Sequence, residues 1–473
     1  MKLSGVMEHV NAIPVLPITH WKETSVTVLG MGRSGRSAAD LLLDRGAHVT
    51  LVEEHPQPVL EDLRPDYEQR GARLCFGGDL EAVLSPADLL VVSPGVPADH
   101  VLCQRARQQN IPVIGEIELA AWFLQAPIIA VTGTNGKSTT VRLIGAILQA
   151  SGKRAFVGGN LGLPLCEAVP RSADPSAPTD YDYIVAEVSS FQLESIQQFK
   201  PWIAVLLNMT PDHLDRHSTQ QEYQSAKQRI FENQTEQDWM ILNADDPLVQ
   251  MMSGDSKARR CEFSLRHEVA QGLYVEGNMI WARRPDAEDL EFEREAIPLR
   301  GDHNVANAMA AMNVGLLCGC SREEIVKALQ STSPFEHALE AVCTWHGVLF
   351  VNDSKGTNVD ATLMALKSFE EPVVLILGGK DKGGDFSRLS ETINHGVKGV
   401  VVIGEATPLI LDALEGYTAM VCAANLEDAV GQAASLAASG DVVLFSPACA
   451  SFDMFQNYHQ RGLEFKRLVR ELS

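Results

Sequence analysis

Residues 128–150 read IIAVTGTNGKSTTVRLIGAILQA. The apolar run from Ile128 to Thr132 predicts a buried strand, and the run from Thr139 onward predicts a helix. A glycine-containing loop between a strand and the N-terminus of a helix surrounds a phosphate with backbone N–H groups. We therefore expect this segment to be an α/β unit that binds a nucleoside triphosphate.

The loop consists of Gly133, Thr134, Asn135, Gly136, Lys137, Ser138 and Thr139. Its lysine would neutralise charge on the β- and γ-phosphates, and Ser138 is placed to ligate Mg2+. Only two residues separate Gly133 from Gly136, fewer than the four that separate the glycines of the usual phosphate loop. The alternative interpretation is an accidental glycine turn.

Short apolar runs such as SVTVLG, PVVLILGG and DVVLFSPA alternate with helix-like segments along the chain. Runs that are apolar on both faces suit a parallel sheet covered by helices on both sides. A connecting helix near Glu116 and a helix end between Ser331 and Pro334 divide the chain into residues 1–115, 116–334 and 335–473. The sequence thus predicts the α/β class and, at 473 residues, about three globular units.

A second glycine-rich turn, GMGRSG at 30–35, follows the strand SVTVL. Glu53 and Glu54 end the next strand about twenty residues later, and taken alone this is the dinucleotide fingerprint of a dehydrogenase. The same turn also suits another nucleotide diphosphate, or simple helix–sheet packing. Ser93 and Gly95 follow a further strand at the same carboxyl edge, where ligands of open α/β sheets bind.

Polar residues also follow two strands of the middle segment. Glu187 ends the strand YDYIVAEVSS, where its carboxylate could reach Mg2+ at a neighbouring phosphate loop; a strand-end acid satisfied by the protein is the alternative. One histidine of the cluster NMTPDHLDRH, at 208–217, is a candidate metal ligand or a structural residue. Lys227 lies on a predicted helix, and local sequence alone predicts a solvated charge there.

Lys and Arg number 39 against 61 Asp and Glu, which gives a net charge of −22. This charge excludes proteins that follow a nucleic-acid backbone or coat an anionic membrane, so local positive groups must meet any phosphate ligand. Nine cysteines without a CxxC pair indicate a reduced, cytoplasmic compartment. We find no signal-like segment and no run of about 18 apolar residues, and we expect neither export nor membrane insertion.

Taken together, the phosphate loop, the Lys227 helix and several further motifs resemble the bacterial muramyl ligases, cytosolic enzymes that add amino acids to a UDP-linked peptidoglycan precursor. The further motifs are GGNLGLP (158–164), AEVSSFQLE (186–194), NMTPDHLDRH (208–217), GDHNVANAMAA (301–311), NDSKGTN (352–358), LGGKDKGGDF (377–386) and SPACASFDMFQNYHQRG (446–462). The resemblance extends from Val26 to the C-terminus. It implies a Rossmann-like UDP-binding domain at 1–115, a P-loop ATPase-like domain at 116–334 and a Rossmann-like amino-acid-binding domain at 335–473.

Within the family, the likeness is strongest to the members that use D-glutamate. The resemblance implies that ATP phosphorylates the terminal carboxylate of UDP-N-acetylmuramoyl-L-alanine and that the amine of D-glutamate then attacks the acyl phosphate. It assigns catalytic roles to Lys137, His213 and Lys227. It further implies two Mg2+ ions, one held by Ser138 and Glu187 and one by His213 and Lys227, with CO2 forming a carbamate on Lys227. We expect a monomer that binds small molecules and no nucleic acid.

The resemblance also assigns contacts to the substrates. It places Gly30, Gly32, Arg33, Ser34, Glu53, Ser93 and Gly95 at the UDP group, Asn160 near the precursor, His303, Asn304, Asn307, Asp353 and Lys355 at ATP, and Thr357, Lys382, Ser451 and Tyr458 around D-glutamate. One position departs from the family pattern: Ala338 follows His337 where the family usually has an arginine that contacts ATP. Either another arginine compensates or ATP binds more weakly.

Overall fold

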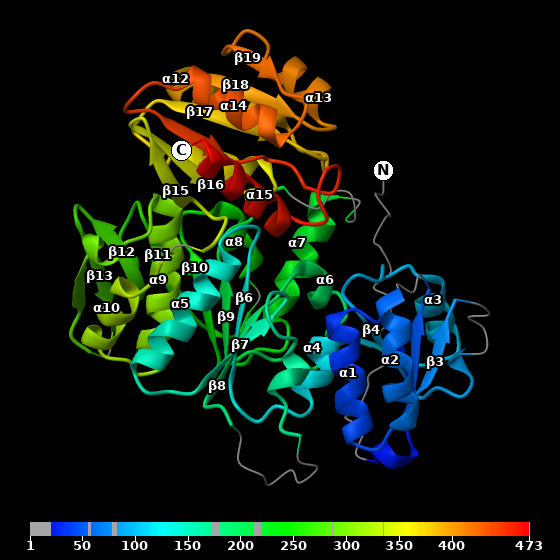
Figure 1. Cartoon of the computed structure of the whole chain (residues 1–473). Coiled ribbons are helices and arrows are strands. Elements are labelled where there is room, and N and C mark those ends of the chain that lie inside the picture. Colours follow the sequence, from blue (N-terminus) through cyan, green and yellow to red (C-terminus); the bar gives the residue numbers. More distant parts are fainter. Residues whose placement is uncertain are drawn as a thin grey trace, which may run out of the picture.

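The computed structural model describes residues 20–54, 58–77, 83–171, 180–211, 217, 219–254, 256–285, 287–333 and 335–472. Three sheets of mostly parallel strands follow one another along the chain, each with helices on its faces (Figure 1). The structure therefore confirms the predicted α/β class and three-domain layout.

The first domain is built on a five-stranded parallel sheet in the order β3-β2-β1-β4-β5. Its elements are β1 (Ser25–Leu29), α1 (Arg33–Asp44), β2 (His48–Glu53), α2 (Pro58–Gln69), β3 (Arg73–Phe76), β4 (Leu89–Val92), α3 (Val101–Gln108) and β5 (Val113–Gly115). The order reverses direction next to β1, so the glycine-rich turn after β1 and the turn after β4 meet at one carboxyl edge.

The central domain has a nine-stranded sheet in the order β14-β13-β12-β11-β10-β9-β6-β8-β7. Its elements are α4 (Glu116–Ala121), β6 (Ile128–Thr132), α5 (Lys137–Ala150), β7 (Ala155–Gly159), β8 (Tyr183–Glu187), α6 (Ser190–Leu193), β9 (Ile203–Leu206), α7 (Gln220–Gln228), β10 (Trp239–Asn243), α8 (Pro247–Met252), β11 (Arg259–Ser264), β12 (Gly272–Glu276), β13 (Met279–Arg283), β14 (Leu290–Glu293), α9 (Asp302–Leu317) and α10 (Arg322–Gln330). The strands up to β12 are parallel, whereas β12, β13 and β14 form an antiparallel meander that our sequence analysis did not predict.

The C-terminal domain has a six-stranded sheet in the order β15-β16-β20-β17-β18-β19, parallel except for the hairpin of β15 and β16. Its elements are β15 (Glu340–Trp345), β16 (Val348–Asn352), α11 (Val359–Leu366), β17 (Val373–Gly378), α12 (Ser390–Gly396), β18 (Val397–Ile403), α13 (Thr407–Ala413), β19 (Met420–Cys422), α14 (Leu426–Leu436), β20 (Val442–Phe445) and α15 (Tyr458–Glu471). The buried runs VVLILG of β17 and VVLF of β20 form its centre, as their composition predicts.

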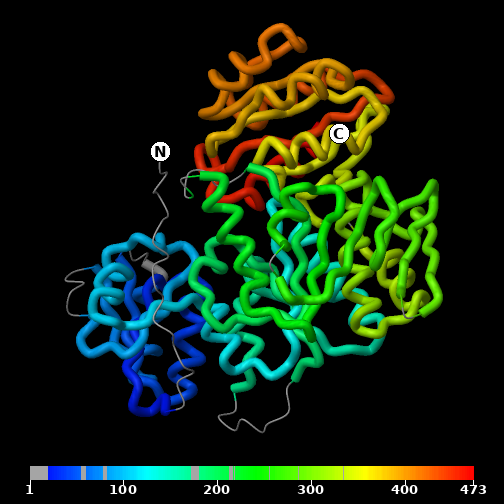
Figure 2. The backbone as a smooth tube through the Cα atoms, turned by 180° about the vertical axis from the view of Figure 1, so that it is seen from behind, coloured from blue at the N-terminus to red at the C-terminus, as the bar shows by residue number. Residues whose placement is uncertain are grey.

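The first and third domains both pack against the central one, and Figure 2 shows the same arrangement from behind. The first domain shares a hydrophobic core with it: the rings of Trp21 and Phe123 lie 5.4 Å apart, and the Arg45 guanidinium lies 5.1 Å from the Phe123 ring. The contact with the third domain is more polar and includes an ion pair of 3.9 Å between Arg300 and Glu371. Across the described residues, no helix combines the length and the apolar character needed to cross a membrane.

Helix α4 joins the first two domains and carries two buried carboxylates. Glu118 accepts backbone hydrogen bonds of 2.8 Å from residues 197, 198 and 199. Glu116 accepts one bond of 2.6 Å from Cys166 N through Oε1, while its Oε2 has no hydrogen-bond partner within the described part of the chain. Burial raises the pKa of Glu116 to about 7.

We expect Glu116→Gln to change the pH dependence of stability. The unfolded carboxyl releases its proton near its ordinary pKa of 4.5, whereas the folded one keeps it until about pH 7. Folding of the wild type is therefore disfavoured progressively as the pH rises from about 4.5 to 7, by on the order of 1–3 kcal/mol, and the amide variant lacks this loss. We measure the thermal midpoint of the variant minus that of the wild type. This difference should be larger, in favour of the variant, at pH 8 than at pH 5.

The control is the exposed Glu391→Gln, whose midpoint should follow the wild type at both pH values. A difference between Glu116→Gln and wild type that is the same at pH 5 and pH 8 would contradict this account.

Candidate active site

The loop between β6 and α5 is held open by backbone conformation and by its neighbours. Gly133 and Gly136 have φ of +146° and +88°. Asn208, just beyond β9, clamps the loop, because its Oδ1 accepts from Asn135 N at 2.8 Å and its Nδ2 donates to Asn135 O at 2.9 Å. The loop is thus fixed at the carboxyl edge of the sheet and at the N-terminus of α5, a position that favours a bound phosphate.

Two lysines bring positive charge to this loop. Lys137 Nζ donates to Gly133 O at 2.9 Å and to Thr134 O at 2.8 Å. Lys227 Nζ donates to Gly133 O at 2.9 Å and to Thr132 Oγ1 at 3.3 Å. Both ammonium groups therefore donate to the same carbonyl oxygen, that of Gly133 at the start of the loop.

The expectation of a solvated Lys227, drawn from local sequence, is wrong. The residue is only 1% exposed, and its Nζ lies 4.8 Å from the centre of the Tyr223 ring on the same helix. The Tyr223 hydroxyl in turn donates to Thr134 Oγ1 at 3.3 Å. Tertiary packing of α7 against the phosphate loop, which no local pattern reports, buries this lysine.

Glu187 ends β8, the strand paired with β6, and is 2% exposed. Its Oε1 accepts from Asn160 Nδ2 at 3.0 Å. Its Oε2 is buried and, within the described ranges, has no hydrogen-bond partner. A buried carboxylate oxygen without a donor is costly unless a cation or a proton meets it, so this atom fits a hard metal ion.

The C-terminal domain supplies two further groups whose pKa values respond to the charge of Glu187. Burial lowers the pKa of Lys355, an effect opposed by the charge of Glu187 and reinforced by that of Lys137. Burial also raises the pKa of Tyr458, and the charge of Glu187 raises it further. Asn358 Nδ2 donates to Asn135 Oδ1 of the phosphate loop at 3.3 Å. The site is therefore assembled from two domains.

Asp353 lies beneath this contact and is buried. Its Oδ2 accepts from Ser446 Oγ at 2.7 Å and its Oδ1 from Leu339 N at 3.1 Å. Burial raises the pKa of Asp353 to about 7, although both of these hydrogen bonds lower it. In this structure the carboxylate therefore holds the interdomain connection to β16 and β20.

Three of the predicted ATP residues, His303, Asn304 and Asn307, lie at the start of α9. Asn307, 5% exposed, faces Gly136, and Asn304 Nδ2 donates to Arg300 O at 2.7 Å. Burial lowers the pKa of His303 to about 4, so its imidazole is neutral at pH 7. Beside them lies an open cavity of about 470 Å³ between the central and C-terminal domains, lined by Arg300, Gly301, Ser368, Glu370 and Glu371. Apart from Gly301, which lies in a quoted motif, sequence reasoning missed these lining residues because they come from two separate loops.

The predicted UDP residues meet at the carboxyl edge of the first sheet. Ser93 Oγ donates to Gly30 O at 2.8 Å, and Glu53 Oε2 accepts from Met31 N at 2.9 Å. A Cβ on Gly35 would lie 1.8 Å from Gly30 O, so this position needs glycine for close packing of the turn. Gly32 is the N-cap residue of α1, which begins with Arg33 and Ser34. Gly95 lies in open space, because a Cβ added there would meet no atom within 4 Å.

The loops predicted to surround the amino acid pair with one another. Lys380 and Ala450 exchange two backbone hydrogen bonds of 2.9 Å, which brings Lys382 and the 2% exposed Ser451 to neighbouring loops. Thr357 follows Lys355 on the segment beside them. Sequence reasoning missed the fully buried Arg461, which donates to Ser354 O at 2.8 Å and to Cys449 O at 3.1 Å; its place in the quoted motif YHQRG was the available signal.

His213 lies outside the described residues, so its role stays a prediction.

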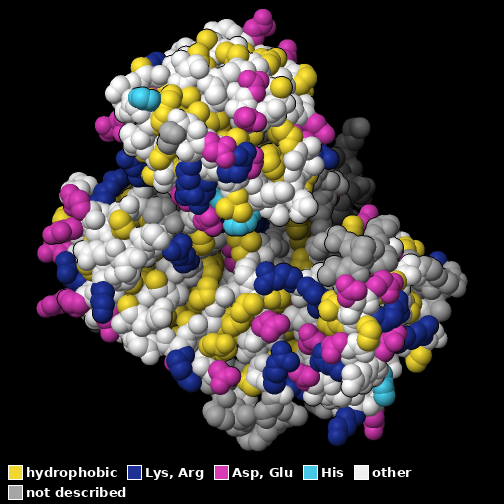
Figure 3. Space-filling view, in the orientation of Figure 1, with side chains coloured by type: hydrophobic (Ala, Val, Ile, Leu, Met, Phe, Trp, Pro, Cys, Tyr) yellow, Lys and Arg dark blue, Asp and Glu magenta, His cyan; other side chains and the backbone are white. Residues whose placement is uncertain are grey.

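Ala338 stands where the family usually has an arginine, and Arg142 of α5 approaches the same segment. The guanidinium carbon of Arg142 lies 4.7 Å from the centre of the Phe335 ring, and its Nη2 lies 3.2 Å from Ser333 Oγ. Figure 3 shows Lys and Arg side chains on the rim of the crevice below the C-terminal domain.

The fit between Gly136 and Asn307 yields a test of the loop. A Cβ at Gly136 would lie 2.1 Å from Asn307 Oδ1, whereas one at Gly152, just beyond the other end of α5, would meet nothing within 4 Å. Both glycines have positive φ, +88° and +74°, so an alanine is strained at either position. We expect Gly136→Ala to weaken ADP binding by about tenfold or more and Gly152→Ala to leave it within about twofold, as measured by calorimetry.

Equal losses of ADP affinity in the two variants would show that backbone strain, and not the contact with Asn307, limits the loop.

Comparisons with known proteins agree with this architecture. Family models described as "Mur ligase MurD-like, N-terminal domain", "Mur ligase middle domain" and "Mur ligase, glutamate ligase domain" match residues 24–115, 131–315 and 339–449. The UDP-N-acetylmuramoylalanine–D-glutamate ligase of Koribacter versatilis is 45% identical over 453 residues, covering 95% of this chain and 97% of that protein. The ligase of the same name from Geotalea uraniireducens is 45% identical over 454 residues, covering 94% and 97%.

Among solved structures, a pseudomurein peptide ligase type C from Methanothermus fervidus shares the fold, with a TM-score of 0.62 and 16% identity over 95% of this chain and 100% of that chain. Identity above 40% to the two curated relatives over nearly the full length, together with the three matching family models, leaves one conclusion. The chain belongs to the Mur ligase family.

Proposed function

We propose that the chain joins D-glutamate to UDP-N-acetylmuramoyl-L-alanine at the expense of ATP, in the synthesis of a peptidoglycan precursor. The observation that carries the proposal is that the C-terminal domain reaches the phosphate loop, where Asn358 Nδ2 donates to Asn135 Oδ1 at 3.3 Å and where the charge of Glu187 acts on the pKa of both Lys355 and Tyr458. Such a junction suits a reaction in which a phosphorylated acceptor and an incoming amino acid meet. The names of the two curated relatives support the choice of substrates.

The reaction has two chemical steps. A carboxylate oxygen of the precursor takes the γ-phosphoryl group of ATP, and ADP leaves. The amine of D-glutamate then forms a C–N bond to the acyl carbon, loses a proton, and the C–O bond to phosphate breaks with its electron pair. Lys137 and the loop would hold the β- and γ-phosphates, while Lys355 of the C-terminal domain would offset the charge that develops during transfer.

Magnesium would bind at the edge of this loop. Glu187 Oε2, which lacks a donor within the described residues, supports one ligand position, and Ser138 at the second residue of α5 supports another. We assign His213 and Lys227 to a second ion. Bound Mg2+ would supply electrostatic stabilisation of the phosphoryl oxygens.

Lys227 would be carbamylated. The ammonium first loses one proton; the neutral amine nitrogen then attacks the carbon of CO2 and a second proton leaves, so that the cationic side chain becomes an anionic oxygen ligand. Lys227 is buried and lies against Gly133 and Thr132, beside the phosphate loop, and both facts support this role. A carbamate buried at this position would be stable only beside a cation such as Mg2+.

The outer substrate groups follow from the remaining geometry. The UDP group would occupy the turn at Gly30 and Ser93 with Glu53, and the D-glutamate carboxylates would meet Lys382 and the hydroxyls of Thr357 and Ser451. All nine cysteines are free thiols, which supports a reducing, cytoplasmic compartment. We propose a monomer, since each predicted substrate contact lies within the one chain.

Phosphate release from ATP is expected to require both UDP-N-acetylmuramoyl-L-alanine and D-glutamate. A panel of amino acids in this assay discriminates among ligases, because the groups around Lys382 are complementary to a second carboxylate and not to a basic side chain. Release should be largest with D-glutamate and near background with L-lysine or meso-diaminopimelate. Equal release with either of these, or none with D-glutamate, would refute the assignment.

The carbamate makes a separate prediction. Lys227→Ala should lose most of its activity, and short carboxylic acids should restore part of it by placing an oxygen ligand in the vacated volume. Lys137→Ala is the matched control: its lysine acts as a cation on the same loop, so carboxylic acids should not restore its activity. Unchanged activity in Lys227→Ala, or equal rescue of both variants, would contradict the carbamate.

A further inference from the structure

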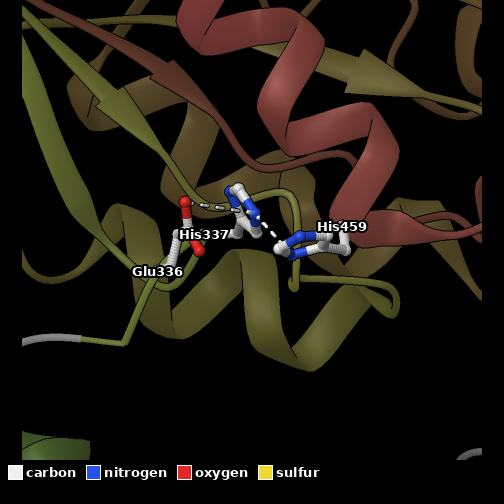
Figure 4. A group of neighbouring side chains, drawn as sticks. All are labelled: Glu336, His337 and His459. Atoms are coloured by element: carbon white, nitrogen blue, oxygen red, sulfur yellow. Dashed lines mark hydrogen bonds and ion pairs between the residues drawn. The ribbon is translucent and has the colours of Figure 1, made fainter.

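A pair of histidines lies where the connection between the central and C-terminal domains meets α15. His337, 1% exposed, and the exposed His459 approach each other with 2.9 Å between His337 Nε2 and His459 Nδ1, and Figure 4 shows Glu336 beside them. Neither histidine has a place in the mechanism proposed above.

The surrounding hydrogen bonds determine which nitrogen of His337 carries the proton. Asn352 Nδ2 lies 2.8 Å from His337 Nδ1, 3.2 Å from Gly462 O and 3.3 Å from Glu340 Oε2. Two of these neighbours are oxygens that can only accept, so the Asn352 amide points its N–H groups this way and His337 Nδ1 accepts. A neutral His337 then carries its proton on Nε2 and donates it to His459 Nδ1. Burial lowers the pKa of His337, which keeps the ring neutral.

The same arrangement argues against a metal ion held by Glu336, His337 and His459, although one ligand atom of each lies within 4.8 Å of the others. A metal on His337 Nε2 would require a proton on Nδ1, directly opposite the Asn352 donor. In addition, Lys466 Nζ binds Glu336 Oε1 at 2.8 Å. The cluster therefore favours a hydrogen-bonded histidine pair.

The pair connects two parts of the candidate active site. On one side, His337 O accepts from Lys355 N at 2.9 Å, and His337 itself is held at φ +65°. On the other side, His459 follows Tyr458 in the first turn of α15, and Ser354 Oγ donates to Tyr458 O at 2.8 Å. A shift of either histidine would move the backbone next to Lys355 or Tyr458.

The packing leaves little room for adjustment around His337. A Cβ on Gly462 of α15 would lie 2.3 Å from His337 Nδ1, so helix and imidazole are in direct contact. If His459 offered no acceptor, the His337 Nε2–H would be left without its partner inside a packed interface, which is unfavourable.

We propose that His459 is a positioning residue for the ligase site: by accepting the His337 Nε2–H it joins the interdomain connection to α15, and so holds the backbone at Lys355 and the backbone at Tyr458 in place together. The kinetic effect that we predict rests on the proposed function. The hydrogen bond between His337 and His459 does not depend on that function.

The test compares His459→Asn, whose Oδ1 can replace Nδ1 as acceptor, with His459→Leu, which has none. Leu463→Ala, at a 45% exposed position on the same helix, is the control. We expect His459→Leu to lower kcat and ADP affinity by roughly tenfold, with the KM for the UDP-linked precursor unchanged. His459→Asn should recover most of both, and Leu463→Ala should match the wild type.

A second measurement is independent of catalysis. With [15N]histidine labelling, the wild type should show a neutral, Nε2-protonated His337 whose signal disappears in His337→Asn and shifts in both His459 variants. An Nδ1-protonated His337, stoichiometric Zn2+ binding that perturbs both histidines, or wild-type kcat and ADP affinity in His459→Leu would overturn the proposal. If the amino-acid panel fails while ADP affinity and this spectrum behave as expected, the substrate assignment is wrong and the positioning role stands.

Discussion

The phosphate loop must expose backbone N–H groups to an anion while the remaining polar groups of the same peptide stay paired, and the domains are arranged around this requirement. Asn208 clamps the loop from the end of β9, and Lys227 binds its first carbonyl oxygen. Asn307 packs against Gly136, and Asn358 reaches Asn135 from the C-terminal domain. Each of these contacts comes from a different segment, so the loop is also where the central and C-terminal domains are brought into register.

Electrostatics explain how so acidic a protein can serve anionic substrates. The net charge of −22 describes the whole chain, whereas the site gathers the buried Lys227 and the half-buried Lys137 and Lys355. Charges act more strongly where water is partly excluded, so a few cations shielded from solvent outweigh many solvated carboxylates. The acid excess also contributes directly, since Glu187 presents an oxygen suited to a metal ion.

The two interdomain contacts differ in character. Trp21 and Phe123 belong to a hydrophobic core common to the first and central domains, which makes these two a unit. The C-terminal domain meets the central one through Asn358 and the ion pair of Arg300 with Glu371. The polar contact coincides with the candidate site, so the residues that would touch substrate also hold the third domain in place.

The sequence by itself determined the α/β class, the parallel strands that bear the glycine turns and the phosphate loop, because each of these is a local pattern of burial period and turn chemistry. It did not predict the antiparallel strands β12 to β14, and its local pattern around Lys227 predicted a solvated helix residue, whereas the family resemblance alone assigned that lysine to the site. Only the tertiary structure decided that Lys227 is buried against Gly133, that Asn358 of the C-terminal domain meets Asn135 of the phosphate loop, and that His337 meets His459. The physical reason is that local periodicity reports which face of an element is buried, whereas the partner that buries it is selected by packing between segments far apart in the chain.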